Sequence, residues 1–478
     1  MNEDTVILLP PALREHILLP LALRERLLAT IEQRLPKKSF GYLLSDGEAH
    51  RPLDFIVFEG NIRNDATWKE HFESFGQYFV DHEDAGFVAT PEESWRVHNE
   101  IWARGMVEVG VFHSHLRHPA NFSGVDFALH LARFEHLWHM IISIRNQAMP
   151  QVRVFSVSRT GVREVPVRNP EIAPPDTSAS RSFSMRGAAN ITSLAEARLL
   201  FQADAAGRPK YLGNRAIITT LDRLIRTGQR EIMEEFYTHG FLRDSAFRFQ
   251  EYIAPTLCHL EGGPFQMGTD PPDTLHFCGE SPRHRVQLSP FSLMRIPVTN
   301  KLYGLFDQQW LDVPTGDRQK PATGMTWFDA AVFALWMGCR LPTEAEWEFA
   351  CGGGSEGEWC CPEERLLKRY AWYSENAQGE IHPVGTREAN AFGLYDLHGN
   401  VWEWCQDTYE QDYYSRSPVV DPVNASSVLT SLMPQFVEKV CRGGSMNMFS
   451  EMCRTRYRLH EPASFLAYDL GFRLAKSC

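Results

Sequence analysis

The stretch Gly110-Val-Phe-His-Ser-His-Leu-Arg-His-Pro-Ala-Asn-Phe-Ser-Gly-Val-Asp126 decides how the N-terminal part of this chain is interpreted. Residues 106–112 lead into it with an alternating, β-rich pattern that predicts a strand. Side chains at positions i and i+2 of a strand point to the same face, so His113 and His115 are expected to direct both imidazoles at one point. Asp126 follows a loop rich in Pro, Asn and Ser, where a helix could begin and bring the carboxylate to the same point.

Two imidazoles, one carboxylate and an open fourth position are typical of a catalytic zinc site rather than a closed structural one. The sequence therefore predicts zinc bound by His113, His115 and Asp126, with the Ser123 hydroxyl beside the ligands or on the oxyanion side. The alternative stays open, because an isolated His-x-His pair on a strand is more often a surface or packing feature. Four other nearby histidines are expected to be surface or packing residues, since the site already has three ligands: His118, His130, His136 and His139.

The full spacing of His113, His115, Ser123 and Asp126 resembles the JAMM (MPN+, JAB1/Mov34) metalloprotease family. The resemblance implies that the two histidines and the aspartate are the zinc ligands. It also implies that Ser123 is catalytic and polarises the scissile carbonyl. The expected reaction is hydrolysis of an amide or isopeptide bond at the tail of a small ubiquitin-like or sulfur-carrier protein.

The same resemblance implies a general base, a glutamate three residues before a glycine on an early strand. Lys38 occupies that position here, three residues before Gly41. A protonated lysine cannot accept a proton from zinc-bound water. Glu32, Glu48 and Glu59 lie nearby in the sequence and could replace the missing carboxylate if the strand is offset. Two functions therefore stay open for this domain, a zinc hydrolase and a degenerate MPN module that only binds a partner.

Length and composition limit the number of domains, the class of partner and the location that the sequence allows. A chain of 478 residues predicts two to four domains. A formal net charge of -12 and the lack of a basic run argue against a nucleic-acid binder. The first residues carry acids where a secretory signal needs Lys or Arg, and no apolar run approaches the length of a membrane span. The sequence therefore predicts a cytoplasmic protein with no membrane partner.

Cysteine usage and local pattern divide the chain into four parts. All ten cysteines lie from Cys258 onward, without a Cys-x-x-Cys pair, and free thiols are expected. Residues 1–165 alternate strands and helices and predict an α/β domain with a mixed sheet and flanking helices. Residues 166–190 have the Pro/Ser-rich composition of a linker, and residues 191–257 predict a helical spacer. Residues 258–478 are rich in turns, Gly and Trp.

Six segments of this last part resemble the formylglycine-generating (sulfatase-modifying) enzyme family. They are Gly262–Gly268, Glu280–Val286, Ile296–Asn300, Arg340–Ala350, Gly393–Trp404, and Arg442–Ser445 ending in Leu470–Arg473. The resemblance implies a C-type-lectin-like α+β domain with little regular secondary structure. A fold of this kind does not by itself establish an activity.

The resemblance also implies metal sites in the C-terminal domain. Two cysteines bind copper in the enzymes of the family, and Met448 and Cys453 occupy those places here. Of the two expected copper-binding cysteines, this chain has only Cys453. The alternative role for Cys453 is that of a small, buried apolar side chain. The loop from Asn400 to Glu403 resembles the family's calcium loop, since oxygen ligands suit a hard cation. The expected role of this domain is recognition, and the alternatives are a lectin-like binding module or an oxygenase or oxidase that uses copper or iron.

Overall fold

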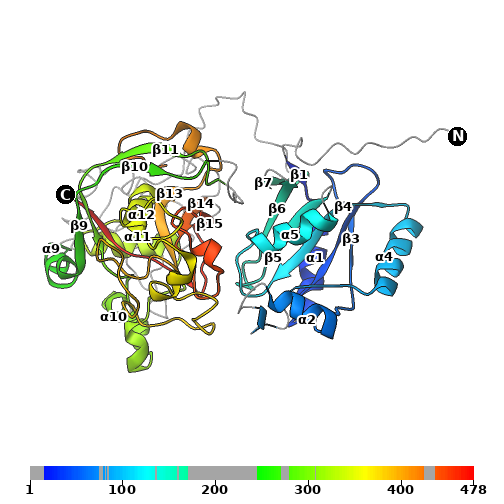
Figure 1. Cartoon of the computed structure of the whole chain (residues 1–478), viewed down its shortest axis with the longest axis horizontal. Coiled ribbons are helices and arrows are strands. Elements are labelled where there is room, and N and C mark those ends of the chain that lie inside the picture. The colour runs from blue at the N-terminus through cyan, green and yellow to red at the C-terminus, as the bar shows by residue number, and fades with distance from the viewer. Residues whose placement is uncertain are drawn as a thin grey trace, which may run out of the picture. The chain divides into compact units, whose positions relative to one another are not determined.

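The computed structural model of the chain describes residues 16–74, 79, 80, 82, 86–134, 137–158, 161–170, 245–270, 279–306, 308–424 and 437–478. The chain divides into two compact units, an N-terminal and a C-terminal one (Figure 1). Most of the expected linker and helical spacer lies outside the described residues. No described helix combines the length and the apolar character that crossing a bilayer requires. The cytoplasmic location stays a prediction.

Both units extend into the region expected to connect them. In the N-terminal unit, β8 (Val167–Arg168) pairs in parallel with β1 (Ile17–Leu18). In the C-terminal unit, α9 (Ser245–Arg248) is followed by a π-helical turn, Phe249–Ile253, and a 3₁₀ turn, Ala254–Thr256. Arg248 donates a hydrogen bond to the carbonyl of Trp336 at 2.8 Å, with its guanidinium over the Trp336 ring. These helical turns therefore belong to the C-terminal unit.

The N-terminal unit is built on one six-stranded mixed sheet. Its strands in spatial order are β3 (Asp54–Val57), β2 (Phe40–Ser45), β4 (Val107–His115), β5 (Trp138–Ser143), β6 (Gln151–Ser158) and β7 (Gly161–Val165). Strands β4 and β5 are parallel, and every other neighbouring pair is antiparallel. The helices of this unit are α1 (Leu21–Gln33), α2 (Ala66–Glu73), α4 (Pro91–Ala103) and α5 (Gly124–Arg133).

Both faces of this sheet are covered. Leu27 of α1 belongs to a core cluster with Phe112, and Val97 of α4 belongs to another with Val111. Because side chains alternate along β4, Val111 and Phe112 point to opposite faces. His113 lies two residues after Val111 and therefore points to the face that α4 covers. The expected mixed sheet with flanking helices is present.

The C-terminal unit has short strands and long irregular segments. Its elements are β9 (Leu257–Leu260), β10 (Gly263–Met267), β11 (His284–Leu288), β12 (Phe291–Met294), α10 (Asn300–Tyr303), α11 (Trp327–Trp336), α12 (Glu344–Gly352), β13 (Trp402–Thr408), β14 (Glu438–Arg442), β15 (Leu459–Pro462), β16 (Leu470–Gly471) and β17 (Ala475–Ser477), with 3₁₀ turns at Gln308–Leu311, Thr315–Gln319, Glu364–Arg369, Tyr413–Arg416 and Ser450–Cys453. Its largest sheet has the order β15-β14-β13-β16. The nine described cysteines form no disulfide. The C-type-lectin-like class stays a prediction.

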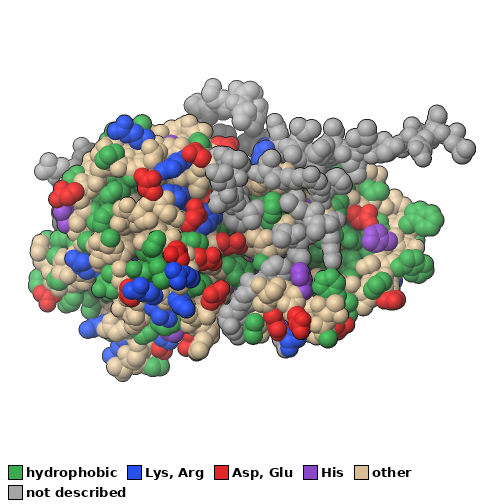
Figure 2. All heavy atoms as spheres, in the orientation of Figure 1, with side chains coloured by type: hydrophobic (Ala, Val, Ile, Leu, Met, Phe, Trp, Pro, Cys, Tyr) green, Lys and Arg blue, Asp and Glu red, His purple; other side chains and the backbone are tan. Residues whose placement is uncertain are grey.

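Buried ion pairs hold the sequence motifs of this unit together. Arg442 pairs with Glu344 and Glu348 of α12, and all three side chains are at most 2% exposed. Both carboxylate oxygens of Glu403 accept hydrogen bonds from Arg473 at 2.6 Å. Charges this deeply buried require a partner, because desolvation of an unpaired charge is expensive. The motif residues therefore form the framework of the fold. On the surface in view, acidic and basic side chains are interspersed (Figure 2).

Candidate metal centre

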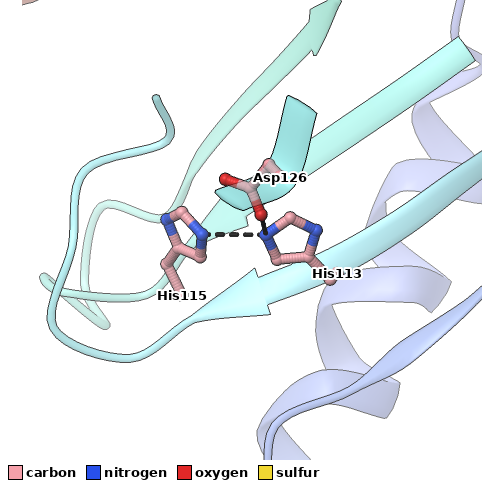
Figure 3. A group of neighbouring side chains, drawn as sticks. All are labelled: His113, His115 and Asp126. Carbon is pink, nitrogen blue, oxygen red and sulfur yellow. Dashed lines mark hydrogen bonds and ion pairs between the residues drawn. The ribbon is translucent and has the colours of Figure 1, made fainter. Parts of the chain in front are cut away.

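Two neighbouring elements of the N-terminal unit carry the predicted zinc ligands. His113 and His115 lie at the C-terminal end of β4, and Asp126 lies in the first turn of α5 (Figure 3). The two Nε2 atoms are 2.8 Å apart, and His113 Nε2 is 3.4 Å from Asp126 Oδ1. One ligand atom from each of the three residues lies within 4.8 Å of the others. Among the described residues this is the group of His, Cys, Asp or Glu side chains close enough to share a metal ion.

A capping box assigns separate roles to the two oxygens of Asp126. Ser123 is the N-cap of α5 and accepts the Asp126 backbone N–H through its Oγ at 3.1 Å. Asp126 Oδ2 accepts from the Ser123 backbone N–H at 3.0 Å and from the Ser123 hydroxyl at 2.6 Å. Oδ1 is left to face His113. The start of the helix thus fixes the carboxylate that the metal requires, and the hydroxyl proton of Ser123 points at that carboxylate.

The outer nitrogens of both imidazoles are already occupied. His115 Nδ1 lies 2.6 Å from the carbonyl oxygen of Pro119. A carbonyl only accepts, so Nδ1 carries the proton and Nε2 keeps its lone pair. His113 Nδ1 lies 2.8 Å from His139 Nε2, and His139 Nδ1 lies 2.9 Å from His130 Nδ1. With a proton on Nδ1 of His113, its Nε2 also presents a lone pair to the centre, as metal binding requires.

Burial keeps these imidazoles neutral. It lowers the pKa of His113 to about 3, with a further contribution from the positive charge of Lys38. Burial also lowers the pKa of His115 to about 3, helped by His113 and Lys38 and opposed by Asp126. The neutral imidazole is the form that binds a metal. His139 and His130 are buried as well. They were expected at the surface or in packing, and they pack directly behind His113. His136 lies outside the described residues.

Lys38 lies on the ligand face, where the resemblance places a glutamate. Phe40 is directly opposite His113 in the β2–β4 ladder. Ser39 and Ser114 continue that ladder, since the Ser114 N–H donates to the Ser39 carbonyl at 2.9 Å. Antiparallel pairing therefore puts Lys38 opposite His115 and on the same face of the sheet. Its charge lowers the pKa values of both histidines, which agrees with this placement.

The three glutamates considered as substitutes for the base lie elsewhere on the surface. Glu32 and Glu48 are exposed. Glu59 is exposed and pairs with Arg34 at 2.7 Å. The identity of the general base stays a prediction. The donor set itself fits zinc, since two neutral imidazole nitrogens and one carboxylate oxygen converge and leave a further position open.

The expected calcium ligands of the C-terminal unit have protein partners. Glu403 is 0% exposed, and Arg473 and the Trp347 indole N–H occupy its carboxylate. The side-chain amide of Asn400 exchanges hydrogen bonds with the backbone of His382 at 3.0 and 3.1 Å. A cation bound by Asn400 and Glu403 would have to displace these contacts. The calcium loop stays a prediction.

The residues at the expected copper positions are fully buried. Cys453 and Met448 are both 0% exposed, and burial raises the pKa of the Cys453 thiol. A protonated thiol is a poor metal ligand. A metal near Cys453 would need Met448 or His460 in reach, and His460 contacts Glu438 at 3.0 Å and stacks on Tyr409. These contacts favour the packing alternative for Cys453, and copper or iron stays a prediction.

Comparison with known proteins places the C-terminal unit. Residues 245–478 match the family model of the sulfatase-modifying factor enzyme 1-like domain. The serine/threonine-protein kinase Pkn1 of Chlamydia trachomatis is 31% identical over 242 residues, which cover 45% of this chain and 37% of that protein. The chain thus spans well under half the length of this relative.

Two further relatives are matched over a larger share of their own length. The formylglycine-generating enzyme of Streptomyces coelicolor is 29% identical over 283 residues, 45% of this chain and 87% of that protein. The inactive C-alpha-formylglycine-generating enzyme 2 of Mus musculus is 31% identical over 217 residues, 33% of this chain and 70% of that protein. These matches confirm the resemblance inferred from the C-terminal motifs. Through this unit the chain belongs to the sulfatase-modifying factor enzyme 1-like family.

Proposed function

We propose that the N-terminal unit is a zinc-dependent hydrolase of JAMM type. Its proposed substrate is an amide or isopeptide bond at the tail of a ubiquitin-like or sulfur-carrier protein, with the C-terminal unit serving recognition. The observation that carries this proposal is the convergence of two Nε2 atoms and one carboxylate oxygen within 4.8 Å. The remaining nitrogens of both imidazoles and the second oxygen of the carboxylate are held by other groups.

His113, His115 and Asp126 would hold the metal. Bound zinc supplies a Lewis acid for the scissile carbonyl and a water of lowered pKa. The chain prepares the ligands for this task, because the Pro119 carbonyl fixes the tautomer of His115 and Ser123 fixes the rotamer of Asp126. A role of Ser123 toward the substrate carbonyl would require its hydroxyl to turn away from Asp126.

Lys38 favours a second candidate, a metal-binding module of the same fold that recognises a tail without cleaving it. A charged ammonium at the position of the general base can donate a proton but cannot accept one. Both candidates require the same metal site, and they differ in whether water is activated there.

Metal analysis and cleavage assays on three variants of the full chain separate the candidates. We expect about one zinc per chain by plasma mass spectrometry in the wild type, loss of zinc in His113→Ala, and no change in His98→Ala, the matched surface control. Cleavage of a ubiquitin-like isopeptide substrate by the wild type supports the hydrolase. Cleavage by Lys38→Glu alone supports the binding module. A wild type without zinc would refute both candidates.

A further inference from the structure

The C-terminal unit contains a positively charged pocket that is separate from the metal centre. The cavity has a volume of about 510 Å³. It is lined by Lys368, Arg369, Asn376, Thr386, Arg387 and Glu388, and is named the Arg387 pocket below. Cavities of this volume accommodate small-molecule ligands.

The charges in the Arg387 pocket do not cancel. Arg369 and Glu388 form a two-pronged ion pair with both contacts at 2.9 Å. No carboxylate among the described residues pairs with Lys368 or Arg387. Burial lowers the pKa of Arg387, and the opposing electrostatic effect of Tyr373 is smaller. Two positive charges of the pocket are therefore left for a ligand.

Arg387 is held in place by rings rather than by acids. Its guanidinium carbon lies 3.5 Å from the centre of the Trp372 ring. Trp372 in turn stacks on His382, with ring centres 3.6 Å apart and planes 12° apart. The indole N–H donates to the Thr386 hydroxyl at 2.9 Å, which fixes the ring. Stacking occupies a face of the guanidinium and leaves the N–H donors at its edge.

One of those donors is buried without an acceptor. Nε of Arg387 has no hydrogen-bond partner, although the atom is inaccessible to solvent. The neutral polar groups of the pocket are satisfied by the protein, since Asn376 donates to the Ala371 carbonyl and accepts from the Tyr373 N–H. A ligand cannot reach this buried Nε–H. An oxyanion in the pocket would instead accept from the terminal N–H groups of the Arg387 guanidinium, which make no hydrogen bond within the described residues.

We propose that the Arg387 pocket binds the phosphate group of a small molecule. Arg387 supplies the planar fork that matches two phosphate oxygens, and Lys368 supplies the second positive charge. A phosphate monoester carries roughly two negative charges at neutral pH, which balances these two cations. The segment that forms the pocket also donates a hydrogen bond from Ser374 N–H to the Met448 carbonyl at 3.0 Å. Ligand binding here would therefore act beside the position where the resemblance places a copper ligand.

Calorimetric titration of the full chain with inorganic phosphate, at constant ionic strength, tests this proposal. We expect saturable binding by the wild type and a loss of about tenfold or more in Arg387→Gln, because a charge-assisted fork is removed. Lys368→Gln should bind several-fold more weakly. Lys301→Gln makes the same change of charge at an exposed position of the same unit and should bind like the wild type.

Arg387→Lys keeps the positive charge but lacks the planar N–H donors of the guanidinium. Weaker phosphate binding by this variant, with an unchanged unfolding temperature, would support the role of the guanidinium. Equal phosphate affinity in Arg387→Gln and the wild type would overturn the proposal. Absence of saturable binding at about 10 mM phosphate would also overturn it, since that is weaker than the millimolar range of small-ligand affinity. Tighter binding of succinate than of phosphate would refute the assignment to phosphate.

Discussion

Replacing His139 by leucine tests whether the chain, and not the metal alone, sets the tautomer of His113. His139 is 4% exposed, and its Nε2 is 2.8 Å from Nδ1 of His113. Leucine keeps apolar contact with the neighbouring Phe122 ring but accepts no hydrogen bond. The Nδ1–H of His113 would then be buried without an acceptor whenever Nε2 binds zinc.

The expected loss of zinc affinity follows from the unpaired Nδ1–H of His113. A buried donor left unpaired costs about 1–3 kcal/mol. Removing a group that orients a metal-binding histidine typically lowers metal affinity about 10- to 100-fold. At about 1.4 kcal/mol per tenfold change, these two ranges overlap at about 1.4–2.8 kcal/mol. We therefore expect His139→Leu to bind zinc about 10- to 100-fold more weakly than the wild type.

Competition against a zinc-binding indicator dye measures this affinity directly. His139→Gln is the matched control, because its amide oxygen can accept from His113 near the position of the lost nitrogen, and it should recover most of the affinity. The absorption spectrum of the cobalt-substituted protein reports ligand geometry independently of catalysis. Wild-type zinc affinity in His139→Leu, together with loss of zinc in His113→Ala, would show that His139 does not orient the ligand.

Three further predictions concern Ser123, Arg473 and Asp407. Ser123→Ala removes the N-cap of α5 and should lower the unfolding free energy, measured by chemical denaturation, by about 1 kcal/mol. It should also weaken zinc binding, because the carboxylate of Asp126 is no longer held. Ser123→Thr should retain both the stability and the zinc affinity of the wild type. Arg473→Met leaves the carboxylate of Glu403 buried without its cationic partner and should destabilise the C-terminal unit by about 3–5 kcal/mol. The double variant Glu403→Gln/Arg473→Met should recover part of this unfolding free energy. Additive losses from the two single variants would contradict this coupling. Burial raises the pKa of Asp407 to about 7, so the folded state binds this proton more tightly than the unfolded state. The contribution of Asp407 to stability should therefore rise as the pH falls from about 8 to about 5, and Asp407→Asn should reduce that slope in denaturant titrations, whereas parallel slopes would contradict the assignment.

Local patterns predicted the parts of the candidate metal centre that depend on neighbours in sequence. The alternation before His113 indicates a strand, and the structure has β4 there. The spacing of Ser123 and Asp126 is that of a capping box, which explains why a helix begins between them. The C-terminal motifs also predicted the family to which that unit belongs.

Contacts between distant strands escaped prediction. His139 lies 26 residues after His113, and the two meet because β5 pairs in parallel with β4. Which distant strands become neighbours depends on tertiary packing and is not encoded by the residues around His113 alone. The same holds for Glu403, whose partner Arg473 lies 70 residues further on. Glu403 is a ligand candidate because its loop resembles the family's calcium loop, and the ion pair with Arg473 cannot be inferred from that loop alone.

The arrangement of the buried ion pairs has an evolutionary consequence. The ion pairs of Arg442 and Arg473 with their glutamate partners do not involve the residues at positions 448 and 453. Met448, at a position where the resemblance places a copper-binding cysteine, is therefore compatible with this architecture. Selection can then recruit the same scaffold for a new task through single substitutions. Retention of the charged motifs in a descendant sequence consequently records ancestry and shape, and does not by itself establish an activity.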